Sequence, residues 1–156
     1  MPIEFVKGDL LSTDDFCAIA HGCNCAGAMA KGIAKEIRNR WPEMYYEYRR
    51  RCQEGRFNLG DVFVWTDGKT TIFNLGTQRS WKTAAELPAI EQSLKRMSDL
   101  AERKGITKIG LPRIGAGLGG LDWTHVKALL ENIARRTSIH FVVFEEYEPA
   151  SPVSIR

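Results

Sequence analysis

The sequence predicts an α/β fold, in which helices cover a mixed, mostly parallel central sheet. Two observations carry this prediction. Short runs of β-branched and aromatic residues alternate with segments in which apolar residues recur every three or four positions, which is typical of strands alternating with helices. Two of the runs, residues 61–65 and 70–76, flank an Asp-Gly pair and predict a hairpin. The hairpin adds an antiparallel pair to the sheet.

The expected strands are short apolar runs that end at turn residues. The first, residues 3–7, ends at Gly8-Asp9, and the second covers residues 17–24. Between them we expect a short helical turn over residues 14–16. The strands that follow the hairpin are expected at residues 107–112 and 139–147.

Two helices are expected between the second strand and the hairpin. Ile33, Ile37 and Trp41 recur every four positions and therefore lie on one face of the first helix. Pro42 either ends that helix or opens the next, because proline disfavours helical geometry in the residue before it. The next helix is polar and aromatic and covers residues 45–52.

Two more amphipathic helices are expected in the second half of the chain, at residues 87–101 and 123–133. Pro88 falls in the first turn of the longer helix, where a missing N–H costs little. With 156 residues the chain is long enough for one domain, which we place at residues 1–148. Residues 149–156 contain Pro and Ser and are expected to form a loose tail.

The composition is that of an ordinary globular protein, with 44% hydrophobic and 26% charged residues. The net charge of +3 permits an anionic partner without implying nucleic acid. The N-terminus lacks a basic leader followed by an apolar core, and no apolar run is long enough to span a bilayer. We therefore expect a soluble cytoplasmic protein with no membrane partner.

The four cysteines, Cys17, Cys23, Cys25 and Cys52, contain no CxxC pair. Cys23 and Cys25 would share a face of a strand and could reach one metal ion, but only His21 lies close in sequence as a further ligand. Buried free thiols are therefore favoured over a zinc site, and this usage suits a reducing compartment.

Three segments are expected beyond the carboxyl ends of the strands, where ligands bind in such sheets. They are Gly8-Asp9, residues 24–34 and residues 113–122. The last two are glycine-bearing loops that lead into helices, so their backbone N–H groups and the helix dipoles favour a negative charge. Phosphate groups are the natural ligands, although the glycines could also serve only as turn residues.

Three polar residues near these loops each have two interpretations. Asp9 could cap the following segment or accept a hydrogen bond from a ligand amino group. Asn24 could satisfy the local backbone or hold a sugar hydroxyl. His21 could be a satisfied core residue or, within reach of a bound phosphate, an acid–base group.

A run of arginines could contact nucleic acid. This arginine cluster is Arg49, Arg50 and Arg51, with Arg38, Arg40 and Arg56 nearby in sequence. The simpler interpretation is a solvated helical face, because glutamates are interspersed with the arginines.

Several spaced motifs together resemble those of a macrodomain, over roughly residues 3–147. In chain order the motifs are VKGDLL, HGCNCAGAMAKGIA, NLGTQRSW, LPRIGAGLGGLDW and FVVFE. The resemblance implies a three-layer αβα sandwich that binds ADP-ribose. It implies that Asp9 receives the adenine amino group, that Phe144 stacks near adenine and that Asn24 lies near the distal ribose.

The resemblance also assigns two loops and their neighbours to the ligand cleft. Residues 31–34 match the loop around the diphosphate and distal ribose, and residues 115–119 match the loop that closes over the diphosphate. The residues implied to bind the ligand are Gly8, Asp9, Leu10, Ala20, Gly22, Lys31, Gly32, Ile33, Ala34, Thr77, Pro112, Gly115, Ala116, Gly117, Leu118, Gly119 and Phe144.

Among macrodomain branches, the chain is most similar to the one with terminal ADP-ribose protein glycohydrolase, DNA ADP-ribosyl glycohydrolase antitoxins and yeast-type ADP-ribose 1''-phosphate phosphatase. The first two use a lysine after the cleft threonine, where this chain has Gln78. The protein glycohydrolase also has a loop aspartate where this chain has Gly119. The His-Gly-Cys-Asn segment instead resembles the phosphatase, which implies His21 and Asn24 as the catalytic residues.

The resemblance therefore predicts a hydrolase that acts at the distal ribose without a metal or cofactor. The group removed would be phosphate, protein or nucleic acid. A non-catalytic reader of ADP-ribose or of ADP-ribosylated macromolecules is the alternative, because Gln78 and Gly119 replace the two groups that relatives use. A module that binds another dinucleotide such as NAD is a third possibility.

Overall fold

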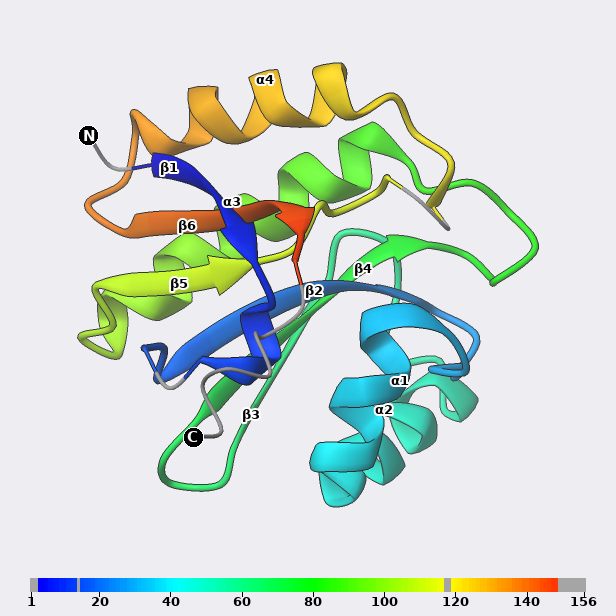
Figure 1. Cartoon of the computed structure of the whole chain (residues 1–156). Coiled ribbons are helices and arrows are strands. Elements are labelled where there is room, and N and C mark those ends of the chain that lie inside the picture. Colours follow the sequence, from blue (N-terminus) through cyan, green and yellow to red (C-terminus); the bar gives the residue numbers. More distant parts are fainter. Residues whose placement is uncertain (1–2, 14, 117–118, 149–156) are drawn as a thin grey trace.

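The computed structural model describes residues 3–13, 15–116 and 119–148. Its central sheet has six strands in the order β1-β6-β5-β2-β4-β3 (Figure 1). Neighbouring strands are parallel except for β3, which is antiparallel to β4. The strand bounds are Ile3–Gly8 (β1), Ala18–Asn24 (β2), Val62–Thr66 (β3), Thr71–Gln78 (β4), Lys108–Leu111 (β5) and His140–Tyr147 (β6).

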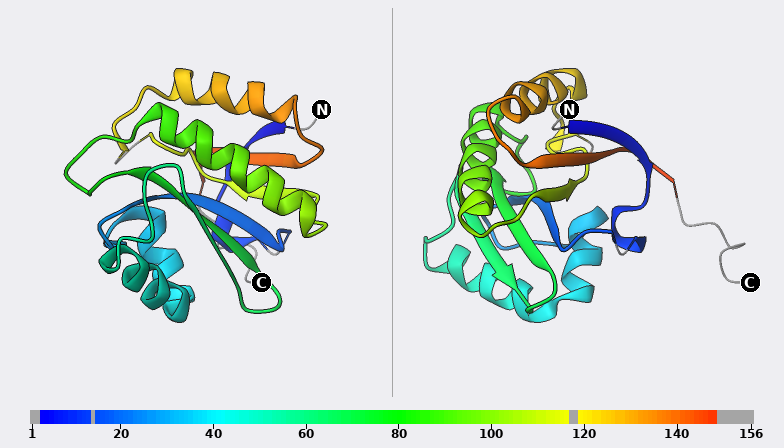
Figure 2. Two further views of the ribbon diagram at one scale, coloured as in Figure 1. Left: turned by 180° about the vertical axis from the view of Figure 1, so that it is seen from behind. Right: turned by 90° about the vertical axis from the view of Figure 1, so that its left-hand side faces the viewer.

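Helices cover both faces of the sheet (Figures 1 and 2). Apolar side chains of α3 and α4 pack on one face, and those of α1 and α2 pack on the other. The helix bounds are Gly32–Arg40 (α1), Pro42–Gln53 (α2), Leu87–Arg103 (α3) and Trp123–Ala134 (α4), with a 3-10 turn, η1, at Leu10–Ser12. The predicted αβα sandwich with a mixed, mostly parallel sheet is confirmed.

Strand β2 lies between the two cores, and its side chains alternate between them. Ala18 and Ala20 pack under α3 and α4, whereas Ile19 and Cys23 pack under α1 and α2. Parallel strands that are covered on both faces are apolar throughout, which explains the continuous apolar run in this part of the sequence.

The helical turn expected at residues 14–16 was wrong, because Asp15 and Phe16 are not helical. The turn lies earlier, at η1, and Asp9 caps it: its Oδ1 accepts a hydrogen bond from Leu11 N at 3.1 Å. Farther along, Thr13 Oγ1 accepts from Asp15 N at 3.2 Å. The capping residue Asp9 thus decides where the helical turn forms.

The remaining element predictions are confirmed to within a few residues. Pro42 opens α2, and Trp41 is both the last cap of α1 and the first cap of α2. Pro88 lies in the first turn of α3 as expected. In the hairpin, Gly68 has a φ of 94°, and Asp67 Oδ1 accepts from Lys69 N and Thr70 N at 2.9 and 2.7 Å. The predicted tail, residues 149–156, lies outside the described residues.

None of the described helices combines the length and the apolar character needed to cross a bilayer. The parallel strands β1, β2, β5 and β6 end at one edge of the sheet, where the segments that were expected to bind a ligand come together.

Candidate functional site

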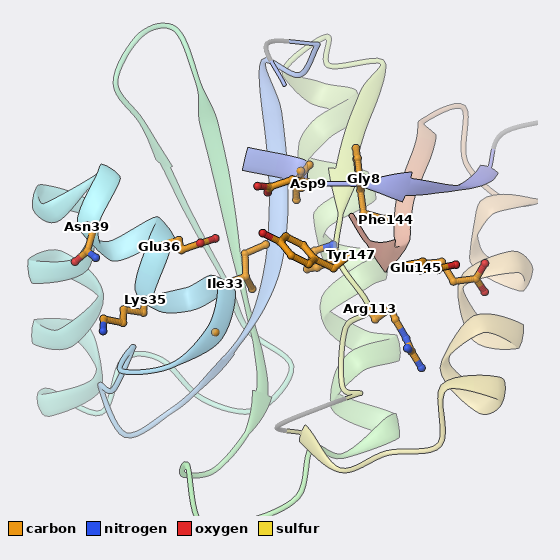
Figure 3. Close-up of a pocket in the computed structure, with 14 residues that line it drawn as sticks. Gly8, Asp9, Ile33, Lys35, Glu36, Asn39, Arg113, Phe144, Glu145 and Tyr147 are labelled. Atoms are coloured by element: carbon orange, nitrogen blue, oxygen red, sulfur yellow. The ribbon is translucent and has the colours of Figure 1, made fainter. Parts of the chain in front are cut away.

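A cavity of about 890 Å³ opens beyond the carboxyl ends of β1 and β6. In Figure 3, Ile33, Lys35, Glu36 and Asn39 project from α1 on one side of this first cavity, and Gly8, Asp9 and Phe144 lie on the other. Its lining is Gly8, Asp9, Leu10, Gly32, Ile33, Lys35, Glu36, Asn39, Pro112, Arg113, Phe144, Glu145, Glu146 and Tyr147.

A second cavity of about 410 Å³ lies at the carboxyl end of β2, beside the loop that leads to α1. Most of its lining is apolar, and Lys31 is its one charged member among the described residues. The lining residues are Gly22, Cys23, Asn24, Ala28, Met29, Ala30, Lys31, Ala34, Gln78 and Trp81.

The N-terminus of α1 separates the two cavities. Gly32 and Ile33 line the first cavity, and Lys31 and Ala34 line the second. The cap residue Lys31 makes no side-chain hydrogen bond to the helix, and the first turn holds no acidic residue. Within the described part of the chain, the first backbone N–H groups of α1 and its dipole are therefore free to hold an anion between the cavities, and Lys31 adds a positive charge.

The other described helices begin differently. Asp9 and Asp122 cap η1 and α4 with their side chains, and α2 and α3 have Pro42 and Pro88 in the first turn. A carboxylate cap competes with a bound anion, and a proline removes one N–H donor. Among these helices, α1 is the one whose N-terminus is built to receive a negatively charged ligand.

The wall of the first cavity next to β1 combines an aromatic ring with a carboxylate. A Cβ on Gly8, which has a φ of 144°, would lie 3.3 Å from Cε2 of Phe144, so glycine here lets the ring lie against the backbone. Phe16 meets Phe144 edge to face, with ring centroids 5.7 Å apart, and fixes its orientation. The Asp9 carboxylate lines the same cavity, so the wall suits a flat ring that carries an amino group.

The acidic residues at the end of β6 have partners of their own. Glu145 Oε1 accepts hydrogen bonds from Lys127 Nζ at 2.7 Å and Trp123 Nε1 at 3.0 Å, which lower the pKa of its carboxyl. Glu146 lies 3.7 Å from Lys7 Nζ in an exposed ion pair. Asp9 Oδ1 accepts the η1 cap bond, and the second carboxylate oxygen gives Asp9 capacity for a ligand donor. Both interpretations of Asp9 are therefore compatible with the structure.

Asn24, at the end of β2, organises the loop that leads to α1. Its Oδ1 accepts from Ala26 N at 3.0 Å, Ala28 N at 3.2 Å and Tyr48 Oη at 3.0 Å, and its Nδ2 donates to Ala28 O at 2.8 Å. The local-backbone interpretation of Asn24 is thus what the structure shows. Because an amide nitrogen has two N–H donors, one donor remains for a ligand in the second cavity.

His21, expected as a catalytic residue, is completely buried and lines neither cavity. Its Nε2 lies 2.6 Å from Asn74 Oδ1, and Cys23 Sγ lies 3.5 Å from the same nitrogen. Burial lowers the pKa of His21 from 6.5 to about 4, although the Asn74 hydrogen bond partly opposes this shift. The structure gives His21 the other role that the sequence allowed, a satisfied core histidine, and argues against a proton donor to a ligand.

Two other expected cleft residues are also interior. Ala20 is fully buried in the core under α3 and α4. Thr77 is 1% exposed, and its Oγ1 donates to Cys23 O at 3.3 Å. Thr77 also leaves no room for a side chain at position 22 of the neighbouring strand β2, because a Cβ on Gly22 would lie 2.9 Å from Thr77 Oγ1. Thr77 thus lies directly against Gly22, which lines the second cavity, and Ala20 belongs to the core.

The second glycine loop is only partly in contact with the cavities. Pro112 lines the first cavity, whereas Gly115, Ala116 and Gly119 line neither of the two. Gly115 has a φ of 78° and accepts a hydrogen bond from Leu121 N at 2.9 Å through its carbonyl. Gly119 O accepts from Ala85 N at 2.8 Å. The expected ligand residues Gly117 and Leu118 lie outside the described residues.

The two positions at which this chain departs from lysine-dependent macrodomains face each other. A Cβ on Gly119 would lie 3.7 Å from Gln78 Oε1 and 3.1 Å from Ala85 Cβ. Gln78 Nε2 donates to Ser80 O at 2.8 Å and to Thr83 O at 3.0 Å. This amide is therefore engaged with its own loop, and the opposite position has no side chain.

Cys23 is the nucleophile-type side chain in the second cavity, but it is buried. Burial raises the pKa of the Cys23 thiol well above its ordinary value, so the thiol stays protonated and is a poor nucleophile. All four cysteines are free thiols. In the described part of the chain, no three His, Cys, Asp or Glu residues gather as metal ligands.

Sequence reasoning missed part of the lining of both cavities. On α1, Glu36 and Asn39 follow Gly32 and Ile33 at helical spacing and therefore lie on the same face of the helix. Trp81 is a single aromatic residue in a polar loop, and the sequence alone does not show that it borders a cavity. Other lining residues outside the expected segments are Lys35, Glu145, Glu146, Tyr147 and Cys23. Ala28, Met29 and Ala30 belong to the expected segment 24–34, and Arg113 belongs to the expected segment 113–122.

The arginine cluster lies outside both cavity linings and is largely engaged in local contacts. Arg51 pairs with Glu47 at 2.9 Å, and Arg40 Nη1 donates to Leu11 O at 2.6 Å. Arg38 lies over the ring of Tyr45, 4.3 Å from its centroid. These contacts favour a solvated, self-paired helical surface.

Comparisons with known proteins agree with this architecture. The Macro domain family model matches residues 20–130. The DNA ADP-ribosyl glycohydrolase of Mycobacterium tuberculosis is 34% identical over 132 residues, which cover 82% of this chain and 37% of that protein. The protein of that name from Thermus aquaticus is 30% identical, with 98% of this chain and 44% of that protein covered. This chain thus spans about two fifths of the length of these relatives.

Solved structures give the same result. The macrodomain of Mycobacterium tuberculosis DarG is similar with a TM-score of 0.83 and 31% sequence identity. The match covers 95% of this chain and 98% of that structure. By the family model, the sequence relatives and the fold, this chain belongs to the Macro domain family.

Proposed function

We propose that this chain binds ADP-ribose across the two cavities. The adenine lies in the first cavity against Phe144 and Asp9, and the diphosphate lies at the N-terminus of α1. The distal ribose lies in the second cavity beside Asn24. The order of these three sites matches the order of the three parts of the ligand.

The observation that carries this proposal is the free N-terminus of α1, placed between an aromatic, carboxylate-bearing cavity and a second, mostly apolar one. A diphosphate needs N–H donors and positive charge at its centre, and a purine needs an aromatic face and an acceptor at one end. The names of the Mycobacterium tuberculosis and Thermus aquaticus relatives support ADP-ribose as this ligand.

We further propose that the chain is a hydrolase which releases DNA from the distal ribose, as the names of the same relatives suggest. In the reaction the oxygen of water bonds to C1'' of the ribose, and the bond from C1'' to the DNA breaks. The DNA leaves with the electron pair and gains one proton, while the water loses one. Holding the diphosphate and ribose rigidly would align water with this carbon, and Asn24 Nδ2 offers one N–H to the ribose.

A second candidate function, a reader that binds the conjugate without cleaving it, is favoured by one observation. Gln78 and the facing Gly119 stand where lysine-dependent relatives carry their reacting groups, and the Gln78 amide is bound to Ser80 and Thr83. Neither position supplies a group that titrates near neutral pH.

Calorimetric titration with ADP-ribose tests the binding proposal, and a folded sample that gives no heat of binding at high ligand concentration would overturn it. The hydrolase proposal is tested by incubation with ADP-ribosylated single-stranded DNA, and free ADP-ribose is the expected product. ADP-ribosylated protein and ADP-ribose 1''-phosphate complete the panel. If the protein binds ADP-ribose and leaves all three conjugates intact, the reader is the correct function.

A further inference from the structure

Trp81 is the most unusual side chain at the second cavity, because it is 66% exposed although it lines that cavity. A single exposed aromatic side chain is ordinary on a protein surface, so the exposure of Trp81 matters because the ring also borders a cavity. Tyr46 on α2 is equally exposed, at 66%, but lies outside the linings of both cavities. Trp81 thus offers an aromatic face next to the place proposed for the distal ribose.

The loop that carries Trp81 is held in one conformation by its own hydrogen bonds. Gln78 Nε2 donates to Ser80 O and Thr83 O, and Thr83 Oγ1 accepts from Ser80 N at 3.1 Å. Lys82 N donates to Ser80 Oγ at 3.2 Å. The backbone that carries the ring is thus ordered before a ligand arrives, so binding does not have to order this loop.

The charges around the ring suit an anionic partner. Lys82 Nζ lies 5.1 Å from the centroid of the Trp81 ring, and Lys31 lines the same cavity. Arg79 is engaged in an ion pair with Glu86, with Arg79 Nε and Glu86 Oε2 3.3 Å apart. An aromatic face with two lysines close by is the combination by which proteins hold the bases and phosphates of single-stranded nucleic acid.

We propose that Trp81 stacks on a base of the single-stranded nucleic acid joined to the distal ribose. Trp81 is then a specificity-determining residue for the attached group, and Gln78 is a positioning residue that acts through the Trp81 loop. This inference rests on the proposed binding of ADP-ribose. It assigns to Gln78 a task that differs from the chemistry of the lysine found there in relatives.

The test compares three ligands: free ADP-ribose, an ADP-ribosylated single-stranded oligonucleotide and an ADP-ribosylated peptide. Trp81→Ala is expected to lower the affinity for the oligonucleotide by roughly tenfold or more, since stacking on one base contributes on this order. Affinity for free ADP-ribose is expected to fall less than affinity for the oligonucleotide, because free ADP-ribose has no attached base to stack on the ring. Trp81→Phe should retain most of the affinity, and Tyr46→Ala, which removes an equally exposed ring, should leave all three affinities unchanged. If the oligonucleotide is cleaved during the measurement, KM and kcat are compared instead.

A double-mutant cycle tests the role of Gln78. Gln78→Ala should weaken oligonucleotide binding in the wild-type background and have no further effect when Trp81 is already Ala. Full additivity of the two changes would remove Gln78 from this role.

The outcomes separate failure of this inference from failure of the proposed function. Wild-type protein that does not bind free ADP-ribose overturns the proposed function. If free ADP-ribose binds and Trp81→Ala weakens binding of free ADP-ribose and of the oligonucleotide equally, or of neither, the stacking role is overturned. A loss of affinity confined to an ADP-ribosylated peptide would instead assign Trp81 to a protein substrate and would also overturn it.

Discussion

The imidazole Nε2 of His21 lies 2.6 Å from Oδ1 of Asn74 in the interior of the sheet. The orientation of the Asn74 amide is fixed by its nitrogen, because Nδ2 donates to Phe63 O at 3.1 Å. Oδ1 must therefore accept, and the proton of the neutral imidazole lies on Nε2. His21, in the His-Gly-Cys-Asn segment, is thus held by Asn74 as a neutral core residue.

This arrangement predicts that the protein loses stability as the pH falls. Burial lowers the pKa of His21 in the folded state to about 4, below the 6.5 of an unfolded chain. Between pH 6.5 and pH 4, His21 is protonated in the unfolded chain but not in the folded protein. The free energy of unfolding therefore falls by up to roughly 1.4 kcal/mol for each unit by which the pH is lowered. The contribution is fully present above about pH 6.5 and is measured by urea denaturation at a series of pH values.

The His21→Gln variant should have a shallower slope than wild type between pH 6.5 and 5, because its amide can still donate to Asn74 but does not titrate there. His125→Gln removes an exposed histidine of α4 and is the matched control. A wild-type slope in His21→Gln would show that another group titrates in this window.

Replacing Asp9 by Asn separates its two roles. Asparagine caps helices as well as aspartate does, so the thermal stability should be unchanged. The amide lacks the second carboxylate acceptor, so calorimetry should show an affinity for ADP-ribose that is roughly tenfold lower. Asp122→Asn changes the matching cap of α4, where Asp122 Oδ1 accepts from Thr124 N at 2.9 Å, and should alter neither property. Full affinity in Asp9→Asn would place the adenine amino group elsewhere.

Lys31→Gln should weaken ADP-ribose binding by roughly threefold at low salt, because an exposed lysine contributes modestly to holding a phosphate. The affinity of the variant should also depend less on salt concentration, since one charge interaction is lost. Lys69→Gln in the β3–β4 turn removes an exposed lysine away from both cavities and is the control. An equal salt dependence in wild type and Lys31→Gln would exclude Lys31 from the anion site.

Alanine substitutions at two glycines of the second loop separate the cost of a steric clash from the cost of backbone strain. Gly115 and Gly120 have φ values of 78° and 74°, so alanine is strained at both. A Cβ on Gly115 would also lie 2.6 Å from Cδ1 of the buried Ile90, whereas one on Gly120 would meet open space. Chemical denaturation should therefore show Gly115→Ala to be the less stable by roughly 1–3 kcal/mol. Equal losses would mean that Ile90 moves aside without cost.

The elements of this fold could be predicted from the sequence because each follows from local chemistry. Pro42 and Pro88 open helices, and the Asp67-Gly68 pair turns the hairpin. The direction of His21 could not be predicted, because β2 is buried on both faces and a strand of this kind has no alternating pattern. Its environment depends on Asn74, which lies 53 residues away in the sequence.

The candidate site was predicted where its residues belong to the strand ends, as for Gly8, Asp9 and Phe144. It was incomplete where the lining comes from the exposed face of α1 or from the Trp81 loop. Exposed polar residues on a helix have no periodic signal that separates a ligand contact from an ordinary solvated face. Local hydrogen bonds of Asn24 and Gln78 likewise depend on the folded path of their loops.

Trp41 ends α1 and begins α2, so the two helices meet at one residue with no loop to absorb a change of angle. Its indole Nε1 donates to Asp67 Oδ2 in the hairpin turn at 3.3 Å, and farther along α2 the Tyr48 hydroxyl donates to Asn24 O at 2.6 Å. The direction in which α1 points its N–H groups is therefore set in part by Trp41, Asp67 and Tyr48, which line neither cavity. Natural variation in the packing of α2 could tune affinity for an anion in small steps while every contacting residue stays the same.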